Sequence, residues 1–436
     1  MRRLLFVAVL VAALLLPVVA QAVLLAGAAR VDLTPQLPGP AGQKICLGGY
    51  GARNAKPAQG VHDPVCARAL VLSDGQQKLC FLSLDATQPP VRLKPDLLAR
   101  LKDLGFGSGG FIVGASHSHS APDNHSDQGP LIAAAFGARS QYLYDKFLEG
   151  ALAAVTQAHA ALRPAVVGCA RTNLVDMSHN RRGEQGGRAS DPALSLLRVD
   201  GQDGKPIALL FNFTAHPTIL DDDNMLISAE WPGAAETALE QALPGAVALF
   251  FNGAEGDQSP STGRFGAKFD AVAGFGGEIA KQALALRGQA KTAPAVRLAV
   301  ASAELALPKP EVSPAFMEIT GKEYGISREI ANAALGALTS KSVEQSVVVV
   351  GDMVLITVPG EMVSEPLGLG LKAMAAQAGF ACPVVVGLSP LDISYILDQK
   401  GYQAGGYEAS MSFYGPGLGQ ALVDGLTRLV AQVKAK

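Results

Sequence analysis

The stretch Phe111-Ile-Val-Gly-Ala-Ser-His-Ser-His-Ser-Ala-Pro122 joins a short apolar run to a polar loop that contains two histidines. The run over residues 111–113 is typical of a buried strand, and Gly114 lets the chain leave it. His117 and His119 stand at alternate positions, so in an extended segment both imidazoles would face one cavity. Imidazole is the commonest protein ligand for transition metals and the usual proton carrier near neutral pH. We therefore expect a metal or acid–base site here; a pair of surface loop histidines is the alternative.

The composition describes a chain with enough apolar residues for a large buried core. Apolar residues make up 49% of its 436 residues and charged residues only 17%, with a net charge of −2. That length suits one large domain or two to three smaller ones. The sequence has no run of basic residues and no basic stripe interleaved with aromatic residues, so we expect no nucleic-acid partner.

The cysteines are scattered along the chain without the CxxC spacing of a zinc-binding motif. They are too few and too far apart for a disulfide scaffold or a thiolate zinc site. Because their number is odd, at least one thiol stays free within a monomer. The five are Cys46, Cys66, Cys80, Cys169 and Cys382.

The N-terminus has the features of a targeting segment. Arg2-Arg3 precedes an apolar run over residues 4–20, and Ala20-Gln21-Ala22 has the small-x-small pattern of a cleavage site. We therefore predict a signal peptide over residues 1–22 and an exported protein, periplasmic or secreted. The apolar character continues through residues 23–29, so an uncut segment that anchors the protein in a membrane is the alternative.

Hydrophobic periodicity and turn residues predict strands mixed with helices, which is typical of an α/β (mixed α+β) fold. We expect central mixed β-sheets flanked by helices, with the active site built from loops at strand ends. We interpret a composition break over residues 287–310 as a linker. The predicted strands cover residues 67–72, 79–84, 111–113, 165–170, 207–213, 246–251, 384–387 and a hairpin over 347–358. The predicted helices cover residues 95–105, 142–162, 231–243, 270–286 and 418–433.

Several of these predicted strands end in polar loops that carry chemically useful residues. The loops deliver His117, His216, Ser259 and Glu361. In α/β folds, sites are commonly assembled from loops beyond the strand ends. His216, taken alone, has the alternative interpretation of a core or capping histidine, but together the four residues predict one shared site.

Seven segments follow one another in a characteristic order. They are Arg30-Val-Asp-Leu-Thr-Pro, Ala115-Ser-His-Ser-His-Ser-Ala-Pro, Asn180-Arg181, Phe211-Asn-Phe-Thr-Ala-His-Pro-Thr, Gly256-Asp-Gln-Ser-Pro, Val358-Pro-Gly-Glu, and Tyr395 with Gly406-Tyr-Glu-Ala-Ser410. In content and order these segments resemble the catalytic domain of the neutral/alkaline non-lysosomal ceramidases, which are zinc amidases. The resemblance runs from about residue 27 to about residue 419. An ordered set of this size makes chance agreement implausible.

The resemblance implies a Zn2+ site and a role for each matching residue. The implied zinc ligands are His117, His216, Glu361 and Tyr395. The implied acid/base group is His119, and the residues that line the substrate amide are Arg181, Ser259 and Tyr407. Two histidines and one glutamate that leave room for water are typical of a catalytic rather than a structural zinc site.

The implied reaction is hydrolysis of the amide (N-acyl) bond of ceramide to a fatty acid and a sphingoid base. Zinc lowers the pKa of a bound water to about 7, and the resulting hydroxide attacks the amide carbonyl. His119 then protonates the departing amine. The implied partners are a lipid substrate and, through transient contact, a membrane surface.

Other functions remain open beside this one. The same zinc chemistry serves another N-acyl amine, an N-acyl amino acid or an ester, because hydroxide attacks any acyl carbon. An inactive lipid-binding surface protein that keeps the fold is a candidate of a different class, and the complete ligand set argues against it. Ser259 has the alternative role of an acylated nucleophile, but its Gly-Asp-Gln-Ser-Pro setting lacks the G-x-S-x-G pattern, so we expect it to bind substrate.

The sequence also departs from the family pattern. Ser120-Ala-Pro-Asp-Asn stands where Ser-Gly-Pro-Gly-Gly is usual, and neither His125 nor the acidic run at residues 221–223 has an assignable role. The chain ends about twenty residues after Tyr414-Gly-Pro416. We therefore expect residues 23–436 to form one catalytic domain without the C-terminal β-sandwich domain that many ceramidases carry.

Overall fold

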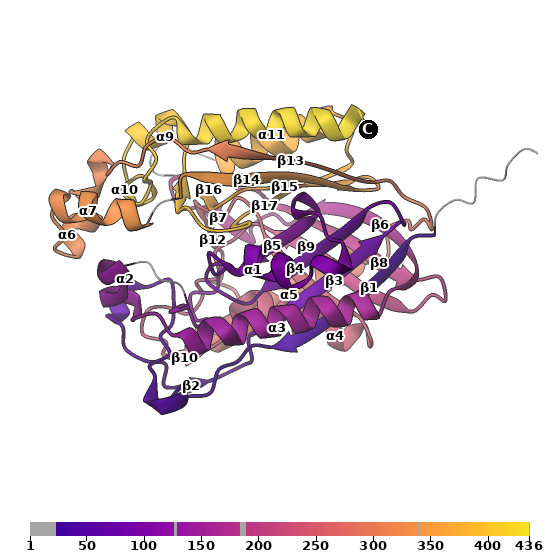
Figure 1. Cartoon of the computed structure of the whole chain (residues 1–436), viewed down its shortest axis with the longest axis horizontal. Helices are drawn as coiled ribbons and strands as arrows, with labels where there is room; N and C mark the ends of the chain where they lie inside the picture. Colours follow the sequence, from indigo (N-terminus) through magenta and orange to yellow (C-terminus); the bar gives the residue numbers. More distant parts are fainter. Residues whose placement is uncertain (1–22, 126–128, 184–188, 339, 436) are drawn as a thin grey trace, which may run out of the picture.

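A computed structural model describes residues 23–125, 129–183, 189–338 and 340–435 of the chain (Figure 1). The predicted signal peptide over residues 1–22 lies outside the described residues. Within the described part, no helix combines the length and the apolar character needed to cross a bilayer.

The larger of two main sheets has eight strands in the order β11-β9-β8-β6-β1-β3-β4-β5. The pairs β4–β5 and β9–β11 are parallel and the other neighbours are antiparallel, so the sheet is mixed. Its strands are β1 (Leu25–Asp32), β3 (Cys66–Ser73), β4 (Lys78–Leu84), β5 (Phe111–Ala115), β6 (Arg163–Asn173), β8 (Ala193–Gly201), β9 (Pro206–Phe213) and β11 (Val247–Asn252).

The two edge strands of this sheet, β5 and β11, approach one another, and this approach positions the loops of the site. Cα atoms of β11 lie within 8 Å of Cα atoms on β3, β4 and β5. The Ser83 hydroxyl donates to the Phe250 carbonyl oxygen across this approach. A Cβ on Gly114 would lie only 2.7 Å from the Phe251 ring, so a side chain at this position would force the strands apart. The loops that follow β5, β9 and β11 therefore meet at one end of the sheet.

The second main sheet has four strands in the order β13-β14-β15-β17. Along β14, Val348 points to the larger sheet while Val347 and Val349 point to the opposite face, as the two-residue period of a strand requires. Both faces of the sheet are covered, which explains why residues 347–350 of β14 are all valine. The strands are β13 (Leu298–Ala306), β14 (Ser342–Val350), β15 (Met353–Thr357) and β17 (Cys382–Val386).

Helices cover the outer faces of both sheets (Figure 1). Helices α1 and α3 pack with the half of the larger sheet that contains β1, β3, β4 and β5. Helices α4 and α5 pack with the half that contains β6, β8 and β11. Helix α11 covers the four-stranded sheet. The longer helices are α1 (Leu93–Arg100), α2 (Gly129–Phe136), α3 (Gln141–Ala160), α4 (Glu230–Ala242), α5 (Lys268–Arg287), α7 (Arg328–Leu338), α8 (Leu369–Gln377) and α11 (Leu418–Ala435). This arrangement confirms the predicted mixed α/β class.

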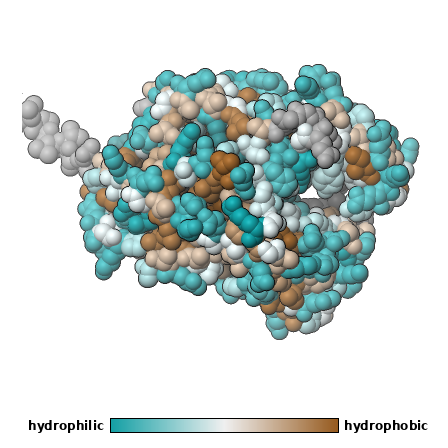
Figure 2. Space-filling model, turned by 180° about the vertical axis from the view of Figure 1, so that it is seen from behind, coloured by the Kyte–Doolittle hydropathy of each residue, from teal (hydrophilic) through white to brown (hydrophobic). Residues whose placement is uncertain are grey.

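Three short strand pairs and three short helices shape the loops at the end of the molecule where the strand ends meet. The pairs are β2 (Gly60–Val61) with β10 (Leu226–Ile227), β7 (Ser178–Asn180) with β12 (Gln258–Pro260), and β16 (Glu361–Met362) with β18 (Tyr395–Ile396). The short helices are α6 (Thr320–Glu323), α9 (Gln399–Gln403) and α10 (Tyr407–Ser410). The space-filling view shows a hollow in the molecule on the side where α2, α6 and α7 lie (Figure 2).

The prediction that residues 287–310 form a linker is wrong. Residues 298–306 form β13, which pairs with the whole of β14 in antiparallel register from Leu298↔Val350 to Ala306↔Ser342. Its sequence, LAVASAELA, is rich in small residues, and its second half is largely exposed. An edge strand with so few large apolar side chains has a weak hydrophobic period, which is why the sequence did not reveal it.

A buried ion cluster ties the larger sheet to helix α4. The guanidinium of Arg68, on β3, lies 2.7 Å from the carboxylates of both Asp85 and Glu236. All three residues are buried. Burial raises the pKa of both carboxyl groups, and the charge of Arg68 opposes that shift.

We expect the substitution Arg68→Met to lower the free energy of unfolding by about 3–5 kcal/mol, because it leaves two buried carboxyl groups without their cation. Arg92→Met is the matched control, since Arg92 forms an exposed pair with Asp96 on α1 and should leave stability nearly unchanged. Urea unfolding of both variants measures the difference. Equal midpoints for the two variants would show that the buried cluster does not stabilise the fold.

Candidate metal centre and active site

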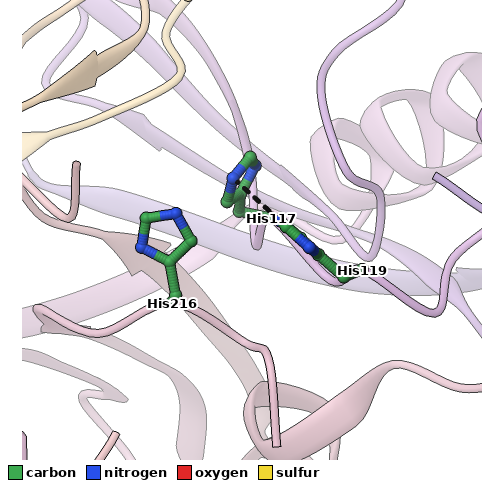
Figure 3. Close-up of side chains that lie close together, drawn as sticks. All are labelled: His117, His119 and His216. Atoms are coloured by element: carbon green, nitrogen blue, oxygen red, sulfur yellow. Dashed lines mark hydrogen bonds between the residues drawn. The ribbon is translucent and has the colours of Figure 1, made fainter. Parts of the chain in front are cut away.

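His117 and His119 lie in the turn that follows β5, and their rings point toward one another (Figure 3). His117 has a left-handed backbone with φ of 72°, and its amide donates to the Ala86 carbonyl oxygen at 2.9 Å. The extended geometry expected for this segment is therefore wrong. The two rings nevertheless converge, with centroids 4.8 Å apart and Nε2 atoms 3.3 Å apart. The turn, rather than the pleat of a strand, aims both imidazoles at one place.

His216 reaches the same place from the end of β9 (Figure 3). Its ring is fully buried, with its centroid 5.0 Å from that of His117 and 5.9 Å from that of His119. One nitrogen from each of the three rings lies within 4.8 Å of the others. The His216 amide donates to the Gln258 carbonyl oxygen at 2.9 Å, which joins this loop to the one after β11.

Glu361 completes the cluster from the four-stranded sheet, because β16 follows β15. Its Oε2 lies 3.0 Å from His216 Nε2 and 3.4 Å from His117 Nε2. Gly360, just before it, has φ of 152°, and a Cβ there would lie 2.5 Å from the Ser394 carbonyl oxygen. Only glycine fits this turn without a shift of the backbone. Loops from both sheets thus bring two imidazoles and one carboxylate together.

The two imidazoles are oriented by carbonyl groups behind them. His117 Nδ1 lies 2.7 Å from the Thr87 carbonyl oxygen, and His216 Nδ1 lies 3.2 Å from that of Gln258. In the tautomer that satisfies these contacts, each Nδ1–H donates and each Nε2 presents its lone pair to the cluster. Such carbonyl-bound imidazoles are typical of metal ligands, and two of them with a carboxylate suit zinc. The residues therefore fit a divalent metal ion.

Charges within the cluster balance one another. Burial would lower the pKa of His117, but the Glu361 carboxylate outweighs it and raises that pKa to about 9. Burial, with the charge of Arg181, lowers the pKa of His216 to about 4. Against burial, the two histidines hold the pKa of Glu361 well below its usual value. A divalent cation would take the place of the proton on His117.

His119 lies beside the cluster, and one of its ring nitrogens is unpaired within the described part of the chain. Its Nδ1 is buried and has no hydrogen-bond partner among the described residues. Burial, and then the neighbouring His117 and His216, hold the pKa of His119 well below its usual value, so the ring is neutral. A neutral imidazole at this position can accept a proton and then pass it to a substrate, and its distance from His117 also suits a further metal ligand.

Arg53 holds the loop that carries His119, and the sequence analysis missed it. Its Nη1 donates to the carbonyl oxygens of His119 and Gly48 at 2.6 and 2.7 Å. Its other nitrogens donate to backbone carbonyls within residues 221–224, which gives that acidic run a structural role. A buried arginine whose hydrogen bonds go to backbone oxygens leaves no spacing signal, because the partners can be any residue type.

Tyr50 packs against His119 from the same loop as Gly48, and it was also missed. Its ring meets that of His119 edge to face, with centroids 4.7 Å apart. A Cβ on Gly49 would lie 2.1 Å from the His119 ring, so the glycine makes room for the histidine. The signal was present in the run Leu47-Gly-Gly-Tyr-Gly51, where paired glycines indicate a close backbone approach.

Tyr395 stands opposite Glu361 in the parallel pair β16–β18, close enough for that carboxylate to raise the pKa of its hydroxyl. Arg181 Nη2 donates to the same hydroxyl at 2.9 Å, and Arg181 Nε donates to Glu408 at 2.8 Å. Burial, followed by the charge of Glu361, raises the pKa of Tyr395 well above its usual value. The structure therefore brings Tyr395 and Arg181 to the cluster and adds Glu408, which the sequence analysis missed although it directly follows Tyr407.

Tyr407 and Ser259 each stand beside a residue that contacts the cluster. The Tyr407 side chain is 45% exposed, and its ring centroid lies 5.7 Å from that of Tyr395. Ser259 is half-buried on β12, where its strand partner is His179. It directly follows Gln258, the residue whose carbonyl faces His216. The structure thus groups Tyr407 with Tyr395, and it connects Ser259 to the cluster through the backbone.

Comparisons with known structures agree with this architecture. The crystal structure of neutral ceramidase from Pseudomonas aeruginosa matches with a TM-score of 0.82 at 19% identity, over 95% of this chain and 75% of that chain. A structure described as ceramidase complexed with C2 matches with a TM-score of 0.81 at 19% identity, over 95% of this chain and 76% of that chain. At such identities these matches show a shared fold.

Sequence comparisons identify the family. Neutral ceramidase of Mycobacterium tuberculosis is 25% identical over 240 residues, which are 49% of this chain and 37% of that protein. Neutral ceramidase B of Dictyostelium discoideum is 26% identical over 265 residues, 54% of this chain and 35% of that protein. The chain thus spans little more than a third of the length of these relatives. A family profile described as neutral/alkaline non-lysosomal ceramidase, N-terminal, matches residues 24–275. More than half of the sequence fits that profile, and the chain belongs to the neutral/alkaline non-lysosomal ceramidase family.

Proposed function

We propose that the chain is a zinc-dependent hydrolase that cleaves the N-acyl bond of ceramide and releases a fatty acid and a sphingoid base. The observation that carries this proposal is the meeting of His117, His216 and Glu361 at one point, with His119 beside them. Its substrate rests on the family, whose members named above are neutral ceramidases.

In this proposal His117, His216, Glu361 and Tyr395 hold the zinc ion. When bound, zinc supplies a Lewis acid that activates a water molecule and polarises the acyl carbonyl. The protein's part is to fix the ligands, and the carbonyls of Thr87 and Gln258 do this for the two imidazoles.

The remaining residues act on the substrate amide. Arg181 donates to the acyl oxygen as negative charge develops there, a role worth about 3 kcal/mol per donor. Its guanidinium is held in place by Glu408 and by the Gly256 carbonyl oxygen. His119, which starts neutral, takes a proton from the attacking water and gives it to the nitrogen as the C–N bond breaks, so that the amine leaves as a neutral molecule.

The proposal also covers the setting of the reaction. Residues 1–22 act as a signal peptide that exports the protein, and residues 23–436 form one catalytic domain. Tyr407 and Ser259 contact the substrate amide where the cluster opens to solvent, and the protein meets its lipid substrate at a membrane surface. Another N-acyl amine, N-acyl amino acid or ester would use the same residues, so the substrate assay decides between these compounds.

Purified protein should release fatty acid and sphingoid base from ceramide, lose this activity on metal stripping, and regain it when zinc is restored. Release is measured by chromatography of both products. Full activity after complete removal of metal would contradict the zinc proposal. If the protein binds zinc and leaves ceramide intact, the metal site stands and the substrate proposal fails.

Substitutions should separate the ligands from the acid/base group. We expect His216→Ala to lose bound zinc together with activity, because one imidazole ligand is gone. His119→Gln should keep zinc and lose about 10²- to 10⁴-fold in kcat, the usual contribution of a positioned proton donor. The control is His159→Gln, since His159 lies on α3 beside Lys78. This variant should keep both bound zinc and activity. Loss of zinc in His119→Gln would instead make His119 a ligand.

Ser259→Ala should lower kcat/KM about tenfold, the cost of one lost hydrogen bond to substrate. Because activated water is the nucleophile in our proposal, wild-type protein quenched during turnover should carry no acyl group on Ser259. Mass spectrometry of the intact protein and of its peptides tests this expectation. An acyl adduct on Ser259 would show that the serine is the nucleophile and would overturn the proposed mechanism.

A further inference from the structure

Two cysteines that are about 210 residues apart in the sequence meet at the junction of the two main sheets. Cys169 lies on β6 of the larger sheet, and Cys382 is the first residue of β17 in the four-stranded sheet. Cα atoms of these two strands approach to within 8 Å. Cys169 packs against the apolar cluster that contains Cys382, and the two thiols are close enough to shift one another's pKa. Both cysteines are free thiols in this structure.

The pair is reachable from solvent on one side only. Cys169 is half-buried and lines a cavity of about 710 Å³, whereas Cys382 is buried. Asp352, whose carbonyl oxygen accepts the Cys382 amide proton at 3.1 Å, lines the same cavity. Three cationic side chains stand around that cavity: Lys291, Arg297 and Lys434. The three cations outnumber the acidic Asp352 in the cavity lining, so a small anionic reagent has an electrostatically favourable route to Cys169.

The Cys382 thiol differs from the other cysteines, whereas contact with Cys382, and then burial, raise the pKa of Cys169. The neighbouring Cys169 thiol, with the charge of Arg171, lowers the pKa of Cys382 against the effect of burial. At Cys66, burial raises the pKa to about 12, and burial also raises that of Cys80. Cys382 is thus the cysteine that most readily supplies the thiolate needed for thiol–disulfide exchange.

We propose that Cys169 and Cys382 form a disulfide that cross-links the two main sheets when the protein meets a disulfide oxidant. Cys169 loses its proton to solvent, attacks one sulfur of the oxidant and displaces the first oxidant thiolate. Cys382 then loses its proton to solvent, and its thiolate attacks the Cys169 sulfur, breaks the mixed disulfide and displaces the second thiolate. Both released thiolates take protons from solvent, so two electrons pass from the cysteine pair to the oxidant.

The cross-link would lie outside the candidate active site and would still support it. His117 and His216 follow strands of the larger sheet, whereas Glu361 follows a strand of the four-stranded sheet. The strand that begins at Cys382 leads to Gly387, whose amide donates to the Asn252 carbonyl oxygen at 3.0 Å. A covalent bond at the start of that strand would keep the two ligand-bearing sheets together while it leaves the reacting groups untouched.

The test uses the full purified chain and oxidised glutathione, a small anionic disulfide. After incubation, we expect a mass lower by two hydrogens and a denatured protein with three titratable thiols in place of five. Peptide mapping should identify a fragment that links Cys169 to Cys382. Because the bond closes a long loop, the Tm should rise by about 5–10 °C over that of the reduced protein.

Single variants serve as controls. Cys169→Ala and Cys382→Ala should each abolish the cross-link and the rise in Tm, whereas Cys66→Ala, at a buried thiol elsewhere, should keep both. If Cys382→Ala does not fold, the half-buried Cys169→Ala is sufficient. Five titratable thiols after oxidation, glutathione that stays bound to Cys169, or a rise in Tm that survives in Cys169→Ala would each overturn the proposal.

Discussion

The carboxylate of Glu361 is buried where the two main sheets meet, and its charge has to be compensated there. An uncompensated buried ion costs several kcal/mol, so the fold must supply partners at hydrogen-bond distance. Those partners are His216, at 3.0 Å, and His117, at 3.4 Å, and both come from loops of the larger sheet. Glu361 comes from the four-stranded sheet, so this one contact requires both sheets to pack in a single relative position.

Hydrogen bonds from two buried side-chain amides fix the positions of the loops on the packed sheets. The side-chain amide of Asn212, on β9, donates to the carbonyl oxygens of Phe251 on β11 and Val385 on β17, at 2.7 and 3.0 Å. It therefore joins three strands from both sheets. The amide of Asn252 donates to the carbonyls of the two residues that immediately precede His117 and His216. Leaving such a buried group unpaired costs about 1–3 kcal/mol, which penalises any displacement of either histidine loop.

Local sequence patterns predicted the strands, whose formation depends on nearby residues. The apolar runs at residues 207–213 and 246–251 correspond to β9 and β11, because a strand buried on both faces needs large apolar side chains throughout. The meeting of His117 with His119 was expected for the wrong reason, since the φ of 72° at His117 replaces an extended backbone with a turn. Arg53 was out of reach, because its partners are backbone oxygens that lie far apart in the sequence. Long-range contacts of that kind exist only once the sheets have packed.

Further acids near the cluster give an electrostatic reason for a cation at this site. Glu255 is fully buried, its carboxylate oxygens have no hydrogen-bond partner among the described residues, and burial raises its pKa well above the usual value. Burial and the charge of Glu361 raise the pKa of Asp392 to about 7. These acids disfavour one another's charged forms in a medium that screens poorly. A divalent cation beside Glu361 would stabilise all of them in the charged form. The same negative potential raises the pKa of His117, at whose Nε2 a proton and a cation would compete.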